Sequence, residues 1–114
     1  QELATVQRYS LPIKILVIDN KYLGMVRQWQ QLFWDRRYSE VDLYDNPDFV
    51  KIGEAYGIPG VLMNKDTSME QQLREFLAAP GAAQLVVECP AEANVYPMVP
   101  AGAALSEMIL EEKK

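Results

Sequence analysis

The sequence predicts an α/β protein, a three-layer α/β/α sandwich around a mainly parallel sheet. Residues 13–18 form an almost continuous β-branched and apolar run, which is typical of a strand covered on both faces of a parallel sheet, and residues 84–88 also predict a strand. Segments with helical periodicity alternate with these strands, and such alternation favours helices on both faces of the sheet. The 114 residues suffice for one compact domain. We expect residues 1–104 to form this domain and residues 105–114 to form a tail with a short helix.

The composition excludes several classes of function. The single cysteine, Cys89, excludes a disulfide framework and a multi-cysteine zinc site, and the absence of histidine leaves oxygen atoms as the metal ligands. A net charge of -5 argues against non-specific binding of nucleic acid. The longest apolar run, residues 15–18, is far shorter than a membrane span. We therefore expect neither nucleic acid nor a membrane as a partner.

The first half of the chain predicts helix, strand, helix and helix in that order. Residues 1–10 have the pattern of an amphipathic helix, and the strand at 13–18 ends at the turn-forming pair Asp19 and Asn20. A second helix is predicted over residues 24–33. Its predicted buried face carries Met25, Val26, Trp29, Leu32 and Phe33, and its predicted solvated face carries Arg27, Gln28, Gln30 and Gln31.

Capping signals mark the next helix. Residues 35–45 are charged and aperiodic, which predicts a loop. Asn46 followed by Pro47 predicts a helix with Asn46 as its N-cap, and Gly57 is expected to end that helix.

The second half of the chain predicts strand, helix and strand, followed by an irregular tail. Residues 58–63 predict a short strand, and residues 67–70 match a capping box at the start of the following helix. After the strand at 84–88, three prolines and many small residues predict irregular structure over residues 89–104. A short final helix is expected over residues 105–112.

The most polar strand end lies at Asp19 and Asn20. Ligands of open α/β sheets bind outside the carboxyl ends of strands, and carboxylate, amide and carbonyl oxygens are ligands that Mg²⁺ prefers. The helix that begins near Gly24 could also favour an anion through its free amides. A strand that ends in Asp-Asn is more often simply a turn, so the residue pattern alone favours the turn and keeps the metal site as the alternative.

Three segments of the sequence resemble one enzyme family. The runs GMVRQWQ (24–30), NPDF (46–49) and VYPMVP (95–100), in this order, are similar to the catalytic large subunit of acetolactate synthase (acetohydroxyacid synthase). The resemblance covers essentially the whole chain and falls in the C-terminal, thiamine-diphosphate-binding third of that subunit. It implies an N-terminally truncated thiamine-diphosphate-binding fold, whose Gly-Asp-Gly motif would lie before Gln1.

The resemblance also implies the role of individual residues. The side chain of Asn20 and the backbone carbonyl of Tyr22 would bind Mg²⁺, and Gly24 and Met25 would complete the cofactor-binding residues. Met25, Val26 and Trp29 would line the substrate pocket. Asp19 stands where the family has a first asparagine, and we expect its side chain to make local hydrogen bonds rather than to bind the metal.

The resemblance implies a transferase that decarboxylates pyruvate and condenses the product with a second 2-keto acid, in branched-chain amino acid biosynthesis. The cofactors would be thiamine diphosphate (thiamine pyrophosphate) and Mg²⁺, with FAD bound mainly by another domain of the parent enzyme. Since the activating glutamate of the family belongs to another domain, we expect no catalytic residue here and no activity of this fragment alone. The implied partners are the remaining domains, a second catalytic subunit in a homodimer or tetramer, and a regulatory small subunit. The implied location is the bacterial cytoplasm.

Two other interpretations fit part of the sequence. A different thiamine-diphosphate enzyme, of the pyruvate oxidase or decarboxylase type, would keep the fold and change the substrate. A receiver-like signalling module would use KILVIDN (14–20) as its first strand and acidic Mg²⁺ site. Trp29 and the segment at 95–100 favour acetolactate synthase over the first of these.

Overall fold

The computed structural model describes residues 1–111, which group into two compact units. The first unit consists of Gln1–Lys21 and Tyr44–Cys89, and the second consists of Tyr22–Leu43 and the chain from Pro90 onwards. Each unit is described by itself below. The predicted division of the chain into residues 1–104 and 105–114 stays a prediction.

A three-stranded parallel sheet organises the first unit. Strand β3 (Ala83–Glu88) lies in the middle, between β1 (Lys14–Asp19) and β2 (Gly60–Leu62). In the register of the sheet, Leu16 of β1 pairs with Leu85 of β3, and Leu62 of β2 pairs with Val86 of β3. The strands and their parallel order confirm the predicted α/β class. β3 is the most buried strand because it has a neighbour on each side.

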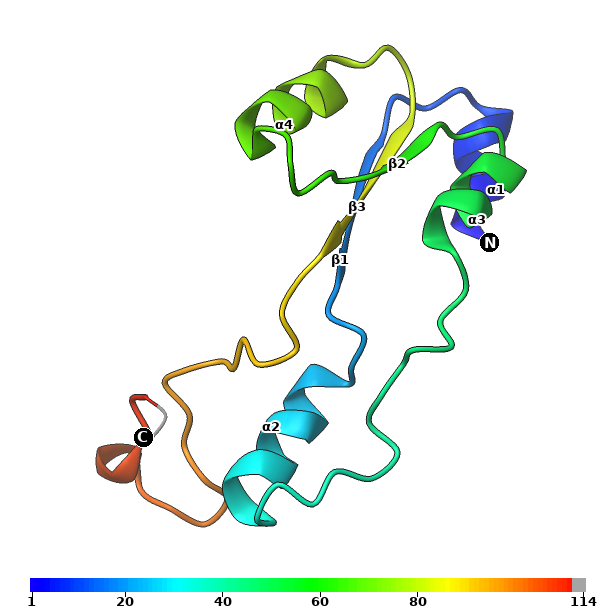
Figure 1. Ribbon diagram of the computed structural model, residues 1–114. Helices are drawn as coiled ribbons and strands as arrows, with labels where there is room; N and C mark the ends of the chain where they lie inside the picture. Colours follow the sequence, from blue (N-terminus) through cyan, green and yellow to red (C-terminus); the bar gives the residue numbers. More distant parts are fainter. Residues whose placement is uncertain (112–114) are drawn as a thin grey trace. The chain divides into compact units, whose positions relative to one another are not determined.

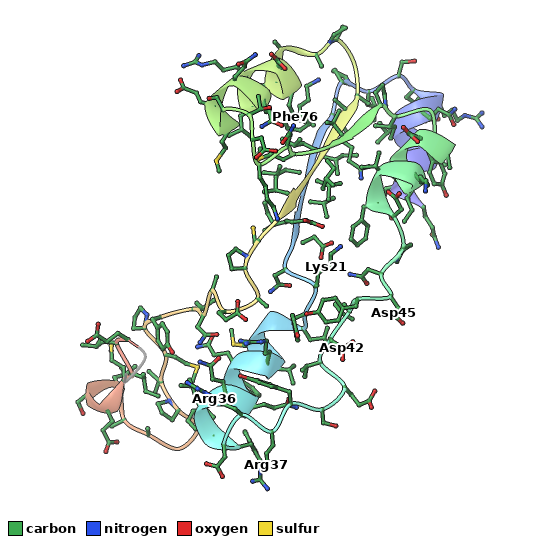
Figure 2. All side chains as sticks on the ribbon, viewed as in Figure 1. Lys21, Arg36, Arg37, Asp42, Asp45 and Phe76 are labelled. Atoms are coloured by element: carbon green, nitrogen blue, oxygen red, sulfur yellow. The ribbon has the colours of Figure 1, made fainter. Side chains whose placement is uncertain are left out.

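Helices cover both faces of this sheet. Figure 1 shows α4 (Met69–Ala78) on one side and α1 (Glu2–Arg8) and α3 (Phe49–Ala55) on the other. Phe76 of α4 is half-buried and points toward the sheet (Figure 2). The core between these layers is small and aliphatic, as expected for short helices on a short sheet. Its buried apolar side chains are Val6, Ile58, Ala83, Leu85 and Val86.

Two predicted caps are displaced along the chain. The N-cap of α3 is Asp48, whose carboxylate accepts the Lys51 N–H at 3.1 Å, rather than the predicted Asn46. The N-cap of α4 is Ser68 rather than the first residue of the predicted capping box. Gly57 has a φ of 69° just after α3, which confirms its predicted role at the helix end.

The prediction that β1 is covered on both faces is wrong for this chain. β1 is an edge strand, and its side chains Leu16 and Ile18 are exposed. A continuous apolar run does not distinguish a central strand from an edge strand, because the pattern records side-chain type and not the number of neighbours.

The second unit is built on one helix and irregular chain. Helix α2 (Gly24–Phe33) has the predicted bounds, and an isolated bridge pairs Tyr22 with Asp42 at its start. Residues 90–104 contain no helix or strand, as predicted, and Met98 forms a bridge with Ile109. The predicted final helix is reduced to one 3₁₀ turn, η1 (Leu105–Glu107), and its end at residue 112 lies outside the described residues.

The predicted orientation of α2 is wrong. Arg27 and Gln28, expected on the solvated face, are only 7% and 1% exposed, whereas Met25, Val26, Trp29 and Phe33 are exposed. The physical reason is that the irregular segment after Pro90 packs on the polar side of α2 and offers it hydrogen-bond partners. Within residues 1–111, no helix has the length and apolar character needed to cross a membrane.

Candidate functional site

A tight polar turn closes the carboxyl end of β1. Asp19 is only 5% exposed, and its Oδ1 accepts the backbone N–H of Lys21 at 3.0 Å. Lys21 has a φ of 59°, in the left-handed region that residues other than glycine adopt rarely. The side chain of Asp19 therefore makes the local hydrogen bonds expected of it from the sequence.

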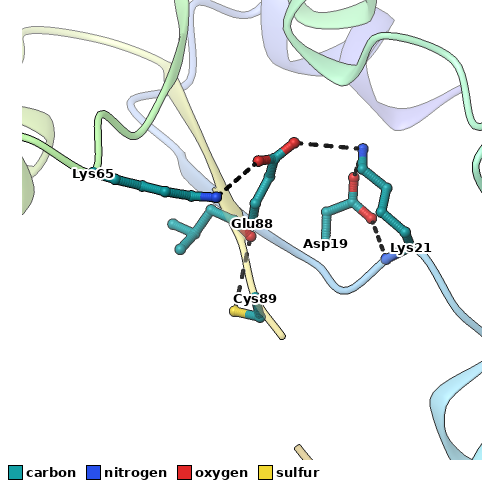
Figure 3. A network of polar contacts seen from close by, with 6 residues as sticks. Asp19, Lys21, Lys65, Glu88 and Cys89 are labelled. Carbon is teal, nitrogen blue, oxygen red and sulfur yellow. Dashed lines mark hydrogen bonds and ion pairs between the residues drawn. The ribbon is translucent and has the colours of Figure 1, made fainter. Parts of the chain in front are cut away.

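A chain of charges extends from this turn across the ends of the strands. The ammonium group of Lys21 pairs with Oδ2 of Asp19 and lies 3.9 Å from a carboxylate oxygen of Glu88 (Figure 3). The other oxygen of Glu88 lies 3.4 Å from Nζ of Lys65, which follows β2. Burial raises the pKa of Asp19, but the hydrogen bonds and charge of Lys21 outweigh it and hold that pKa below its ordinary value. The carboxylate of Asp19 is thus kept ionised and occupied by one lysine.

A polar cavity of about 460 Å³ lies beside this turn, within the first unit. The carboxylates of Asp19, Asp48 and Glu88 and the ammonium of Lys21 line it, above the apolar side chains of Leu62 and Val86. The sequence did not predict this cavity, because it depends on residues 46–50 folding back beside the strand ends.

The first turn of α2 offers hydrogen-bond donors rather than acceptors. Its N-cap is Leu23, which has no side-chain oxygen for the first amides, and the first turn contains no acidic residue. Leu23 itself is held by its N–H, which donates to the carbonyl of Val41 at 2.8 Å. Gly24 opens a helix of 10 residues whose first N–H groups receive no side-chain cap, an arrangement that suits an anion.

An apolar cavity of about 250 Å³ lies in the second unit. Trp29, Phe33 and Trp34 form one wall, and residues 98–101 form the other. Of the three residues predicted for the substrate pocket, Trp29 lines this cavity. Met25 and Val26 stand exposed on the first turn of α2. Asn20 belongs to the first unit, whereas Tyr22 and the residues of α2 belong to the second.

Arg27 is a structural residue of the second unit that the sequence pattern missed. Its guanidinium lies 5.3 Å from the ring centre of Tyr22 and 4.9 Å from that of Tyr38. It also donates to Oε1 of Gln31 at 3.1 Å and pairs with Glu92 at 3.5 Å. Arginine between two aromatic faces is favourable when it is shielded from water, so Arg27 ties the Tyr22 ring to α2.

Gln28 is a second structural residue of the second unit that the sequence pattern missed. Its side-chain amide donates to the carbonyl of Val95 at 2.9 Å and accepts the N–H of Val95 at 2.8 Å. Asn94 adds a bond of 3.3 Å to Gln31. These contacts hold the irregular segment against α2. Their only signal in the sequence is a run of polar side chains on one face of an otherwise amphipathic helix.

The oxygen donors at the end of β1 fit part of a magnesium site. Among residues 1–111, no three side chains of the types Asp, Glu, Cys and His gather in a group that could hold a metal by themselves. Asp19 is occupied by Lys21, and the donors of the predicted kind beside it are the amide oxygen of Asn20 and loop carbonyls. Such neutral hard oxygens suit Mg²⁺, which is bound through few protein ligands and keeps its waters and phosphate oxygens.

Comparison with known proteins places the chain in a family. Residues 1–87 match the family described as thiamine pyrophosphate enzyme, C-terminal TPP binding domain. The acetolactate synthase isozyme 2 large subunit of Escherichia coli is 49% identical over 96% of this chain and 20% of its own length. The mitochondrial acetolactate synthase of Schizosaccharomyces pombe is 41% identical over 97% of this chain and 16% of its own length. The acetolactate synthase large subunit of Porphyra purpurea is 42% identical over 96% of this chain and 19% of its own length.

The chain thus spans about one fifth, or less, of the length of these relatives. The comparisons do not favour the receiver-like interpretation or a thiamine-diphosphate enzyme of another type. Because the family match covers the sheet, its helices and the polar turn after β1, this chain belongs to the thiamine pyrophosphate enzymes, as their C-terminal TPP-binding domain.

Proposed function

We propose that this chain is the C-terminal cofactor-binding part of an acetolactate synthase catalytic subunit. The named relatives, at 41–49% identity over nearly the whole chain, support this activity for the parent enzyme. That enzyme would decarboxylate pyruvate and transfer the two-carbon unit to a second 2-keto acid, a step of branched-chain amino acid biosynthesis. The fragment contributes binding residues and no catalytic residue.

The observation that carries this proposal is the order of donors after β1. Asp19 is engaged with Lys21, Asn20 follows it at the carboxyl end of the sheet, and α2 begins at Gly24 without a side-chain cap. We assign the side-chain oxygen of Asn20 and the backbone carbonyl of Tyr22 as Mg²⁺ ligands. The first amides of α2, at Gly24 and Met25, are suited to the cofactor's diphosphate.

Thiamine diphosphate, when bound, supplies the carbon nucleophile and the electron sink for decarboxylation. The residues of this chain would bind and orient it and shape its surroundings. Met25, Val26 and Trp29 would form a wall of the substrate pocket. The segment at 94–104 would exclude water from it, and a pocket without water limits side reactions of reactive groups.

The remaining parts of the proposal concern what lies outside this chain. FAD would be bound mainly by another domain, and the partners would be the other domains, a second catalytic subunit and a regulatory small subunit. A bacterial cytoplasmic location stays a prediction, since the names of the relatives include mitochondrial enzymes.

Mn²⁺ is a suitable probe of the proposed metal site, because it takes the same oxygen ligands as Mg²⁺ and its spectrum reports binding. Electron paramagnetic resonance of Mn²⁺ with thiamine diphosphate should show binding to the chain. Asn20→Ala should weaken this binding by at least about tenfold, because the loss of even an outer-shell partner of a ligand costs that much.

Asn64→Ala is the matched control. Asn64 also follows a strand of this sheet, and its side chain accepts the N–H of Asp66 at 2.8 Å. This variant should bind Mn²⁺ like the wild type. Equal binding by the wild type and Asn20→Ala would refute the assignment of Asn20.

A further inference from the structure

We propose that Asp19 is the positioning residue of the metal-binding loop: through Lys21 it fixes the backbone that presents Asn20. This inference rests on the proposed function, and it adds a residue that holds the ligand without touching the metal.

The conformation of Lys21 requires such a residue. A φ of 59° places Lys21 in the left-handed region, where the β-carbon of an L-residue crowds the following carbonyl oxygen. Lysine has no side-chain group that favours this conformation by itself. A conformation of this kind persists only when its surroundings hold it, and it concentrates at functional sites.

Asp19 stabilises this conformation of Lys21 from a fixed position in strand β1. One carboxylate oxygen accepts the Lys21 N–H at 3.0 Å, and the other pairs with the Lys21 ammonium. The carbonyl of Asp19 accepts the N–H of Cys89 at 2.9 Å, which continues the pairing of β1 with β3. Both the backbone N–H and the side-chain ammonium of Lys21 are therefore bound to Asp19, a residue of strand β1.

A second layer of charge supports the same lysine. Glu88 lies 3.9 Å from the Lys21 ammonium and is itself paired with Lys65 at 3.4 Å (Figure 3). Asn20, the residue between Asp19 and Lys21, thus has an anchored neighbour on each side. Its side chain is presented from a backbone that cannot turn freely.

This arrangement explains what an aspartate does where the resemblance has an asparagine. Both oxygens of Asp19 are used by Lys21, so the carboxylate is a bridge to the loop rather than a further metal ligand. An asparagine here would still accept the backbone N–H and would lose only the ion pair. The inference therefore predicts that the backbone hydrogen bond, and not the charge, does the positioning.

The test combines two readouts on the 114-residue chain and its Asp19→Ala and Asp19→Asn variants. The first is the hydrogen-exchange rate of the Lys21 amide by NMR, and the second is the affinity for Mn²⁺ with thiamine diphosphate. Asp19→Ala should speed exchange and weaken Mn²⁺ binding by about tenfold each, as for loss of one intramolecular hydrogen bond. Asp19→Asn should stay within about threefold of the wild type in both, because its amide oxygen still accepts the Lys21 N–H.

A suppressor and a matched control sharpen the test. The double variant Asp19→Ala with Lys21→Gly should regain binding to within about threefold of the wild type, because glycine adopts positive φ without being held. Asp48 forms the same pair of contacts with Lys51, at 3.1 Å to its N–H and 3.3 Å to its ammonium. Asp48→Ala should therefore expose the Lys51 amide and leave Mn²⁺ binding unchanged.

The outcomes separate this inference from the proposed function. Wild-type Mn²⁺ affinity in Asp19→Ala, or an Asp19→Asn variant as weak as Asp19→Ala, would overturn the positioning role. A wild-type chain that binds no Mn²⁺ would contradict the proposed function instead. In that case the hydrogen-exchange rate of the Lys21 amide alone would test whether Asp19 fixes the Lys21 backbone. An unchanged exchange rate in Asp19→Ala would overturn that role.

Discussion

Gln28 and Val95 form a two-way hydrogen bond: the Gln28 side chain accepts the Val95 N–H at 2.8 Å and donates to the Val95 carbonyl at 2.9 Å. The glutamine amide thereby satisfies both backbone groups of an irregular residue, as a neighbouring strand would. Two other glutamines do the same, Gln30 with Ser39 and Gln72 with Asn64, but their bonds are exposed. Irregular segments in both units are thus held by helical glutamines.

The burial of this pair predicts a large effect of Gln28→Ala. Gln28 is 1% exposed, so the substitution removes a buried side chain together with both of its hydrogen bonds to Val95. We expect the free energy of unfolding to fall by about 2–3 kcal/mol in urea titrations. Gln30→Ala removes an equivalent but exposed pair and should cost less than about 1 kcal/mol. Equal losses in the two variants would show that burial does not set the strength of this contact.

Arg27 should be replaceable by neither alanine nor lysine. Its guanidinium contacts two tyrosine rings, a glutamine and a glutamate, and a lysine ammonium cannot reproduce that flat stacking. We expect Arg27→Ala to lower the free energy of unfolding by about 2–4 kcal/mol and Arg27→Lys to recover less than half of the loss. Arg37→Ala is the control, since Arg37 is exposed, contacts no aromatic ring face within residues 1–111, donates to the carbonyl of Trp34 at 3.1 Å and pairs with Asp35 at 3.8 Å. Full rescue by lysine would contradict a role for stacking.

The cap of α3 predicts a dependence of stability on pH. The N–H of Lys51 and then its side chain lower the pKa of Asp48 from its ordinary value of 3.8. A carboxylate with a lowered pKa stabilises the fold above the unfolded pKa, and that contribution is lost as the pH falls through the folded pKa. The wild type should therefore be more stable than Asp48→Asn at neutral pH, and the difference should shrink below pH 3.8.

Unfolding of both proteins in urea between about pH 7 and pH 3 measures this difference. Asp45→Asn, in the loop before α3, is the charge-matched control and should show no such convergence. If the stability difference between the wild type and Asp48→Asn grew on acidification, it would contradict the claim that the ionised Asp48 carboxylate stabilises the fold.

The chain alone should have no acetolactate synthase activity. It holds neither the Gly-Asp-Gly segment nor the activating glutamate that the resemblance assigns to other parts of the enzyme. We expect no acetolactate from pyruvate when thiamine diphosphate, Mg²⁺ and FAD are all supplied. Turnover by the purified chain would mean that its own residues include a catalytic group.

Local patterns predicted the elements of this fold well. The bounds of α2 and the existence of β1, β2, β3 and α4 follow from apolar periodicity, which reports the contacts of neighbouring residues in one element. The N-cap of α3 was predicted two residues too early, at Asn46, because Asn46 and the actual cap, Asp48, have the same capping chemistry. The sequence alone does not decide between two adequate caps.

Features that depend on distant residues were missed. Glu92, one partner of Arg27, and Val95, the partner of Gln28, lie more than 60 residues away along the chain, so no local pattern records these contacts. The polar cavity beside Asp19 likewise depends on residues 46–50, 62 and 86 meeting at the strand ends. For the candidate site, the sequence indicated the turn at Asp19 and Asn20, but the left-handed conformation of Lys21 became visible only in the structure.

Paramagnetic broadening by Mn²⁺ tests the central claim most directly, because it maps where the metal sits without requiring activity. With thiamine diphosphate present, trace Mn²⁺ should broaden the amide signals of residues 20–24 first and should spare them in Asn20→Ala. Broadening centred instead on Asp48 and Glu88, in the acidic cavity of the first unit, would contradict a metal site at the end of β1 built on Asn20.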